Sequence, residues 1–262
     1  MRPPAPPVAR VLVVVPARDE ERRLPRCLAA LERAVALAGT PADVVVVADS
    51  CRDRTAAVAA AAGARVVQVA AGSAGAARAA GVRAALAGPT APPAPGTHPG
   101  TDPGTDPATD PAAVWIACTD ADSRVPPGWL RHQLLLAAAG ADLVRGTVRL
   151  ARPPARWLAA YRAGVGEDGH PHVHGANLGV RADRYLAAGG FPDLPVGEDV
   201  ALVEAVAAAG GRVVATTGEP VLTSGRRSGR APDGLSGDLR RLAALAHPRG
   251  PRPAGATTGA PG

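Results

Sequence analysis

The sequence predicts an α/β protein with a doubly wound, mostly parallel sheet that is covered by helices on both faces. Three observations support this class. Short β-branched runs alternate with helical patterns, the runs are continuously apolar, and several of them end in polar or acidic residues. Strands that are apolar on both sides are typical of a parallel sheet between two helical layers. Right-handed crossovers between such strands then give a doubly wound sheet.

Each predicted element follows from a local pattern. Short apolar or β-branched runs predict strands at residues 11–15, 43–48, 65–69 and 114–118. The stretches between them have apolar residues at three- and four-residue steps or are rich in alanine, which predicts helices at 24–38, from about 55, and up to about 86. The strand at 114–118 reads V-W-I-A-C, and its continuous apolar character indicates that both of its sides are buried.

Two segments do not fit this alternation. Residues 88–113 repeat a T-D-P unit and are dense in proline and glycine, so we expect a disordered surface insertion without a core of its own. Because a helix precedes the insertion and a buried strand follows it, the sheet resumes, and residues 1–247 are predicted to form a single domain. The Pro/Gly-rich residues 248–262 are predicted to be a disordered tail.

The charge of the chain bears on its partners. The formal net charge is +6, and all 29 basic residues are arginine. A basic balance is compatible with nucleic-acid binding. However, many arginines lie in roughly the last forty residues, and aromatic residues, which stack on bases, make up only 2% of the chain. We therefore expect no nucleic-acid partner, and an enzyme that handles a phosphorylated substrate needs the same arginines.

The cysteines and the apolar segments predict a cytoplasmic protein. Cys27, Cys51 and Cys118 are odd in number and widely spaced, which argues against a disulfide framework or a zinc ribbon. The apolar run at 11–15 is too short for a signal peptide, and no run is long enough for a transmembrane helix. Peripheral contact with a membrane stays open.

Three predicted strands end in polar groups. The first is followed by P-A-R-D-E-E, the second by D-S-C-R-D, and the strand at 114–118 by T-D-A-D. In open α/β sheets, ligands bind beyond the carboxyl ends of the strands, near a switch in strand order. The three strand ends are therefore predicted to line one polar crevice.

Asp120 and Asp122 follow a buried strand with one residue between them, so both side chains can reach the same ligand. Two carboxylates beside a hydrated Mg²⁺ or Mn²⁺, with phosphate oxygens in the remaining positions, are typical of hard-cation chemistry. We therefore predict that Asp120 and Asp122 bind a divalent cation. The alternative is that Asp122 or Ser123 caps a helix that begins near Pro126 or Pro127.

Five motifs follow one another between about residues 10 and 215: V-V-V-P-A-R-D-E-E, V-V-A-D-S-C-R-D-R-T, T-D-A-D-S, G-A-N-L-G-V-R-A-D-R-Y-L-A-A-G-G-F and G-E-D-V-A-L. In this order they resemble family 2 glycosyltransferases, which bind nucleotide sugars with the GT-A fold. The resemblance implies an inverting, metal-dependent enzyme. It would move one sugar from a nucleotide-diphosphate sugar, with a UDP-sugar favoured, to the hydroxyl of an acceptor that the sequence does not identify.

The resemblance also implies which residues bind the nucleotide sugar. They are a nucleoside loop, a carboxylate that accepts from the base ring, a basic residue near the phosphates and the start of the D-A-D motif: Pro16, Ala17, Arg18, Glu20, Asp49, Arg78, Asp120 and Ala121. Asp19 stands where the family more often has asparagine, and the family's D-D-G-S pattern is A-D-S-C here, so the ribose side of the pocket is expected to differ. Asp53 is expected to cap the next helix, and the alternative for Arg78 is a solvated helix arginine.

The segment G-E-D-V-A-L resembles the family's catalytic acid pair. An inverting transfer needs a general base to deprotonate the acceptor hydroxyl as it attacks the anomeric carbon. The resemblance assigns this role to Asp199, with Glu198 orienting Asp199 or the acceptor. The alternative is a helix N-terminus, where the helix dipole stabilises acidic residues in any protein.

The segment H-P-H-V-H-G-A-N places three histidines, 170, 172 and 174, at alternate positions that can share one face of a strand. Three histidines can form a zinc site. The matching segment of the family lies on the acceptor side, and the resemblance therefore implies that His174, Gly175 and Asn177 contact the acceptor.

Two rival functions and one segment stay open. A sugar nucleotidyltransferase has a related fold, but its G-x-G-x-R loop is expected where this chain has P-A-R-D-E-E. An inactive nucleotide-binding scaffold would keep the nucleoside loop and lose the base, whereas Asp199 is present. Residues 223–230, T-S-G-R-R-S-G-R, are either a lid that clamps the donor pyrophosphate or a solvated linker.

Overall fold

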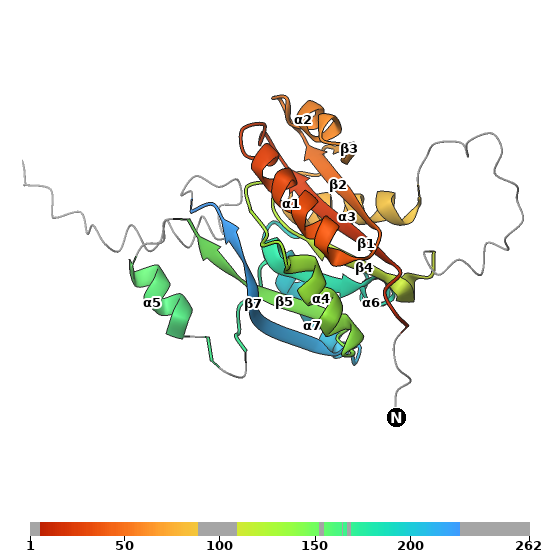
Figure 1. Ribbon diagram of the computed structural model, residues 1–262, viewed down its shortest axis with the longest axis vertical. Coiled ribbons are helices and arrows are strands. Elements are labelled where there is room, and N and C mark those ends of the chain that lie inside the picture. The colour runs from red at the N-terminus through yellow and green to blue at the C-terminus, as the bar shows by residue number, and fades with distance from the viewer. Residues whose placement is uncertain (1–5, 89–108, 152–154, 164, 167–168, 226–262) are drawn as a thin grey trace, which may run out of the picture.

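The computed structural model describes residues 6–88, 109–151, 155–163, 165–166 and 169–225 (Figure 1). Most of the predicted insertion at 88–113, the whole tail at 248–262 and residues 226–230 of the arginine-rich segment lie outside the described residues. The described end of the insertion forms a short 3-10 turn, η1 (Pro111–Ala113), directly before the next strand.

The strands of the described chain are β1 (Arg10–Ala17), β2 (Ala42–Asp49), β3 (Arg65–Val69), β4 (Val114–Cys118), β5 (Leu143–Leu150), β6 (Leu178–Arg181) and β7 (Val213–Thr223). The helices are α1 (Leu24–Ala38), α2 (Thr55–Ala61), α3 (Ala74–Leu86), α4 (Trp129–Ala138), α5 (Ala155–Ala163), α6 (Ala182–Ala187) and α7 (Glu198–Ala208), and a second 3-10 turn, η2 (Gly175–Asn177), precedes β6. All four strands and all three helices that the sequence predicts are present.

The described strands form one seven-stranded sheet in the order β3-β2-β1-β4-β6-β5-β7. The first four strands in this order are parallel, as predicted. Strand β6 runs antiparallel to both of its neighbours, β4 and β5, while β7 runs parallel to β5. The sheet is therefore mixed but mostly parallel, and the predicted α/β class is confirmed.

Helices cover both faces of the sheet (Figure 1). In β1, Val11, Val13 and Val15 belong to the core cluster formed with α1, α2 and α4. The alternate residues Leu12 and Val14 belong to the opposite cluster, which includes residues of α3, α6 and α7. All five side chains are fully buried. This two-sided burial is the physical reason why the strand is continuously apolar.

Helix α3 packs closely against β1 and β2 at Gly81, and its sequence is dominated by alanine and glycine. A Cβ atom at Gly81 would lie 2.6 Å from Cγ2 of Val47 and 2.7 Å from Cγ1 of Val14. A larger residue at this position would push the helix outward. The close approach also draws Arg78, one turn earlier, into the interior of the protein.

The register of the strands places the end of β4 beside β1 and beside the start of β6. Cys118, the last residue of β4, pairs with Val14 of β1 on one side and with Leu178, the first residue of β6, on the other. Because β6 is antiparallel, the turn before it lies at the carboxyl end of β4.

None of the helices in the described part of the chain is long and apolar enough to cross a membrane.

Candidate active site

The ends of β1 and β2 form the first part of the site, an open pocket lined by Arg18, Asp19, Ser50 and Arg52. Asp19 and Ser50 both have a left-handed backbone conformation, with φ of 50° and 51°. Such strained residues tend to occur at functional sites. The family resemblance identified only Arg18 among the four as a site residue. The signal for Ser50 and Arg52 was their position in D-S-C-R-D directly after a buried strand.

Hydrogen bonds tie the loop after β1 to the start of α2. The Asp53 carboxylate accepts from the Thr55 N–H at 2.9 Å and from the Glu21 N–H at 3.1 Å. The N-cap residue of α2 is Arg54, without a side-chain cap bond, so Asp53 holds the turn before the helix and is not its N-cap as predicted. The Glu20 N–H donates to Thr55 Oγ1 at 2.7 Å. The Glu20 side chain is buried and lies 3.4 Å from the Arg23 guanidinium. Glu20 therefore stabilises the turn into α1.

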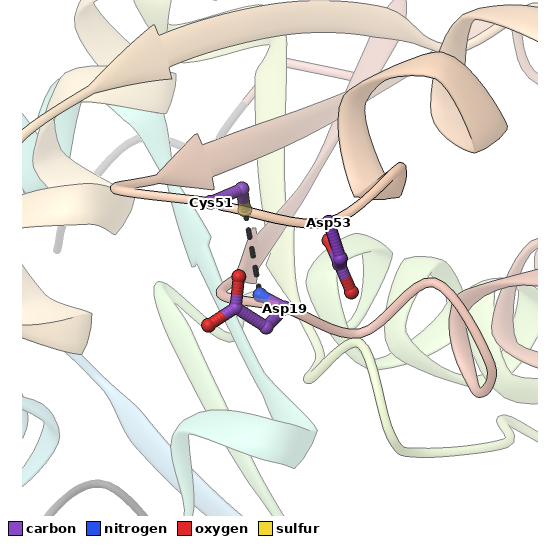
Figure 2. A group of neighbouring side chains, drawn as sticks. All are labelled: Asp19, Cys51 and Asp53. Atoms are coloured by element: carbon purple, nitrogen blue, oxygen red, sulfur yellow. Dashed lines mark hydrogen bonds between the residues drawn. The ribbon is translucent and has the colours of Figure 1, made fainter.

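Among the described residues, Asp19, Cys51 and Asp53 form a group that could hold a metal ion, since their ligand atoms lie within 4.8 Å of one another (Figure 2). The Asp19 N–H donates to the Cys51 sulfur at 3.5 Å, and the Asp19 carboxylate accepts from the Arg52 N–H at 2.6 Å. Burial raises the pKa of Cys51, which favours the neutral thiol. The same contacts also brace the two loops against each other.

Asp49 lies at the end of β2, where its carboxylate is buried and held firmly. Its Oδ1 atom accepts from the N–H groups of Ala71 at 2.8 Å and Gly72 at 3.3 Å, and from the Ser50 hydroxyl at 3.1 Å. These bonds fix the orientation of the carboxylate beside the pocket formed by the β1 and β2 loops.

The loop after β4 places Asp120 and Asp122 at the same edge, and Ala121 between them is buried. Cys27 of α1 lies beneath this loop and donates its S–H to the Asp120 carbonyl at 3.4 Å. Burial raises the pKa of Cys27 to about 12, and the negative charges of Asp120 and Asp122 add to this shift. Both carboxylates therefore lie near enough to the thiol to act on it electrostatically.

The alternative that Asp122 or Ser123 caps the next helix is wrong. Helix α4 begins at Trp129 and its N-cap residue is Gly128. The Ser123 hydroxyl instead donates to Thr223 Oγ1 at 2.9 Å, which joins the loop to the end of β7.

Arg78 connects this loop to α7. Its Nη2 atom donates to Asp120 Oδ1 at 2.6 Å, and its Nη1 atom donates to Glu198 Oε1. The arginine is only 3% exposed, so the alternative of a solvated helix residue is wrong. Burial works to lower its pKa, but the charges of Asp120 and Glu198 outweigh burial and raise it. Arg78 is therefore a permanent cation at the centre of the site.

The acid pair lies at the start of α7. Burial raises the pKa of Glu198, although the charge of Arg78 opposes this shift. Asp199 accepts from the Gly175 N–H at 2.7 Å through Oδ2 and from the Val200 N–H at 2.9 Å through Oδ1. Asp199 therefore lies at a helix N-terminus, as the alternative interpretation expects. This position is compatible with a catalytic role, because the first turn of α7 directs the Asp199 carboxylate toward the turn that precedes β6.

Asn177, which the sequence places on the acceptor side, is buried beneath that turn. Its Oδ1 atom accepts from the Trp129 indole N–H at 2.8 Å, and its Nδ2 atom donates to the Thr147 carbonyl at 2.9 Å and to the Glu219 carbonyl at 3.4 Å. Asn177 therefore joins α4, β5, β6 and β7 in the core. A contact of its side chain with an acceptor stays a prediction.

The histidines 170, 172 and 174 do not lie on a strand, because the segment before η2 has no regular structure. Tyr161 of α5 stacks on His172 with ring centroids 4.1 Å apart, and His174 stacks 6.0 Å from His172. Their nitrogens do not form a metal-binding group within the described residues. His170 instead bonds to the Thr216 carbonyl at 3.0 Å and His172 to the Tyr161 carbonyl at 3.0 Å. The zinc alternative is therefore wrong.

His174 makes stability depend on pH. Burial, and then the charges that His172 and His170 can carry, lower the pKa of His174 to about 4. A histidine in the unfolded chain has a pKa of about 6.5. The unfolded state therefore binds more protons between these values, and stability falls as the pH drops through this window. We expect wild type to lose about 1–2 kcal/mol more than His174→Gln between pH 7 and pH 5, measured by urea unfolding. Equal losses in the two proteins would contradict this role.

Comparison with known proteins identifies the family. The model of the family described as "Glycosyltransferase like family 2" matches residues 6–222. The chain belongs to this family. The match covers the crevice residues from Pro16 to Asp199 and includes all five sequence motifs. No match was found among curated protein sequences.

Solved structures show that this family 2 chain shares the fold of known glycosyltransferases. S. aureus TarS 1–349 in complex with UDP-GlcNAc superposes with a TM-score of 0.59 at 15% identity, over 90% of this chain and 66% of TarS 1–349. The mannosyltransferase PcManGT from Pyrobaculum calidifontis, in complex with GDP-Man and Mn²⁺, superposes with a TM-score of 0.55 at 19% identity, over 91% of this chain and 70% of PcManGT. The chain spans 40% of the longer TarS structure.

Proposed function

We propose that this protein is an inverting, metal-dependent glycosyltransferase that moves one sugar from a nucleotide-diphosphate sugar to an acceptor hydroxyl. The observation that carries this proposal is the arrangement at one edge of the sheet. An open pocket with polar and charged lining residues, the carboxylates of Asp120 and Asp122, and the hydrogen-bonded Asp199 carboxylate follow one another along the ends of β1, β2, β4 and β6. Membership of the family supports the transferase over a nucleotidyltransferase.

The donor nucleoside would lie in the pocket of Arg18, Asp19, Ser50 and Arg52. The fixed Asp49 carboxylate would accept a hydrogen bond from a ring N–H of the base, such as the one that uracil offers in a UDP-sugar. Two arginines at the rim would attract the negatively charged diphosphate before it binds. Contacts with Pro16 and Ala17 would come from the end of β1, where the Ala17 carbonyl already accepts from the Cys51 thiol at 3.4 Å.

The residues after β4 fit a divalent cation. Asp120 and Asp122 offer partly exposed carboxylates, which are the oxygen ligands that Mg²⁺ and Mn²⁺ prefer. Among the described residues around the loop after β4 and the start of α7, the carboxylates of Asp120, Asp122, Glu198 and Asp199 outnumber the buried cation Arg78. When bound, the cation would neutralise the diphosphate leaving group. A structure similar to this chain contains Mn²⁺ with its sugar nucleotide, which also supports this proposal.

Asp199 would remove the proton from the acceptor hydroxyl as that oxygen attacks the anomeric carbon. Its two backbone hydrogen bonds hold the carboxylate in place and leave the second lone pair of each oxygen directed elsewhere. Glu198 is bonded to Arg78 and buried, so it is less suited to accept the proton and more suited to orient its neighbour. The acceptor would approach from the side of His174 and Gly175.

The location and the domain organisation are parts of the same proposal. Cys27, Cys51 and Cys118 are free thiols, which supports a cytoplasmic protein. The described elements on both sides of the insertion belong to one sheet, which supports a single catalytic domain over residues 1–247.

A thermal-shift screen of UDP-, GDP- and dTDP-sugars, each with and without Mn²⁺, tests the proposed function. A true donor binds only the folded state and raises the melting temperature by mass action, by an amount equivalent to about 2.7 kcal/mol at one hundred times the dissociation constant. We expect a UDP-sugar to give the largest shift, followed by turnover of that donor. A protein that no sugar nucleotide stabilises would contradict the proposal.

The Asp122→Asn variant tests the metal. Asparagine keeps the size of the side chain but removes a charge that favours the cation. In calorimetry, wild type is expected to bind UDP at least about tenfold more tightly with Mn²⁺ than with EDTA, since a tenfold change corresponds to about 1.4 kcal/mol. The variant should show little difference between the two conditions. An unchanged response to Mn²⁺ in Asp122→Asn would exclude Asp122 as a ligand.

A further inference from the structure

The guanidinium of Arg78 joins parts of the site that are distant in sequence. It comes from α3, and its two terminal nitrogens donate to Asp120 in the loop after β4 and to Glu198 at the start of α7. These partners are 42 and 120 residues away along the chain. The first is on the donor side of the crevice, and the second is next to Asp199. One side chain therefore spans both halves of the site.

The backbone packs closely around this cation. A Cβ atom at Gly175 would lie 2.5–2.7 Å from three atoms of the Arg78 guanidinium, so only glycine allows the turn before β6 to lie against it. The N–H of the same glycine donates to Asp199. A Cβ atom at Gly75 would lie 2.7 Å from the Glu198 side chain. The guanidinium thus supports the turn that orients Asp199 as well as the residue that precedes it.

These contacts leave Arg78 poorly placed to bind phosphate. The residue is buried, and both of its terminal nitrogens are bonded to carboxylates. A planar guanidinium can bridge two carboxylates that lie at a fixed angle, whereas an ammonium acts as a point charge. The geometry therefore suits a rigid bridge between two acidic groups more than a clamp on a ligand.

We propose that Arg78 is a positioning residue that does not bind the donor phosphates. It fixes the turn before β6, which orients Asp199, relative to Asp120 on the donor side. The inference rests on the proposed function, because Arg78 would preserve the alignment of the donor sugar with Asp199, the proposed general base. A misplacement of about 1 Å in such an alignment can lower a rate by about a hundredfold. Loss of the bridge should therefore lower kcat and leave the affinity for UDP nearly unchanged.

The experiment compares Arg78→Lys with wild type and with Arg83→Lys, an exposed arginine on the same helix. Lysine keeps the positive charge but cannot bond to both carboxylates in the same way. The measurements are the melting temperature, the affinity for UDP with Mn²⁺ by calorimetry, and kcat and KM with the donor. Arg78→Met is made in parallel to show the effect of removing the charge, and it is interpreted only if it folds.

We expect Arg78→Lys to bind UDP within about threefold of wild type and to lose about 10- to 100-fold in kcat, with Arg83→Lys unchanged. A drop of more than about tenfold in UDP affinity would show that Arg78 binds phosphate and would overturn the proposal. An unchanged kcat would overturn it as well. A wild-type protein without turnover would contradict the proposed function instead, and the UDP affinity would still decide whether Arg78 is a phosphate ligand.

Discussion

The Asp199→Asn variant is expected to bind the donor normally and to transfer the sugar about 10² to 10⁴ times more slowly than wild type. Asparagine has nearly the same size and keeps an oxygen that can accept from the Gly175 N–H. It cannot take a proton from the acceptor. If Asp199 only stabilised the start of α7, the substitution would cost about 0.3–1 kcal/mol of unfolding free energy and no activity. Single-turnover transfer, donor affinity and melting temperature on one preparation separate the two roles.

Glu204→Gln is a matched control for this substitution. Glu204 is an exposed acidic residue on the same helix, so its replacement removes a similar charge without touching the site. We expect its transfer rate to equal that of wild type. Intact transfer by Asp199→Asn, with a slightly lowered melting temperature, would assign Asp199 a structural role only and would make Glu198 the next candidate for the base.

The Asn177→Ala variant is expected to be strongly destabilised. The substitution removes the partner of the Trp129 indole N–H and of two backbone carbonyls, at Thr147 and Glu219. A buried polar group without a partner costs about 1–3 kcal/mol, and the total is expected to reach about 3–4 kcal/mol. In a domain of this size 1 kcal/mol corresponds to about 2–4 °C, so the melting temperature should fall by about 6–16 °C.

Trp129→Phe provides the second corner of a double-mutant cycle, because it removes the indole N–H and leaves an aromatic ring. If the two side chains act as a pair, the double variant should lose about 0.5–3 kcal/mol less than the sum of the single variants. If Asn177 binds only the acceptor, Asn177→Ala should fold as well as wild type and raise KM for the acceptor. That result would contradict its role in the core.

Local patterns in the sequence were sufficient for the first half of the fold. The continuous apolar runs of β1, β2 and β4 predict buried parallel strands because burial on both sides leaves no polar position in either face. The spacing of apolar residues from Leu24 to Ala38 gave α1 with the same limits as in the structure. The pair Asp120 and Asp122 was found in the same way, from acidic residues directly after a buried strand.

The sequence could not show how distant segments pair. Strand β6 has four residues, and nothing in its composition indicates that it lies antiparallel between β4 and β5. This pairing places Gly175 beside Asp199. The resemblance implied that Asn177 contacts the acceptor, and the structure adds that the sheet and α4 enclose it and bond to its amide oxygen and its amide nitrogen. The alternation of the histidines fitted a strand, although the backbone there is irregular.

The sequence by itself determined the α/β class, the parallel strands at the start of the sheet and the acidic residues at their ends. Each of these features depends on the pattern of residues that are consecutive in the chain. Only the tertiary structure decided the partners of Arg78. An arginine in an alanine-rich helix looks solvated when its neighbours in sequence are considered alone. It is buried because Gly75, Gly81 and Gly175 allow three backbone segments to approach closely, which brings Asp120 and Glu198 to its two terminal nitrogens.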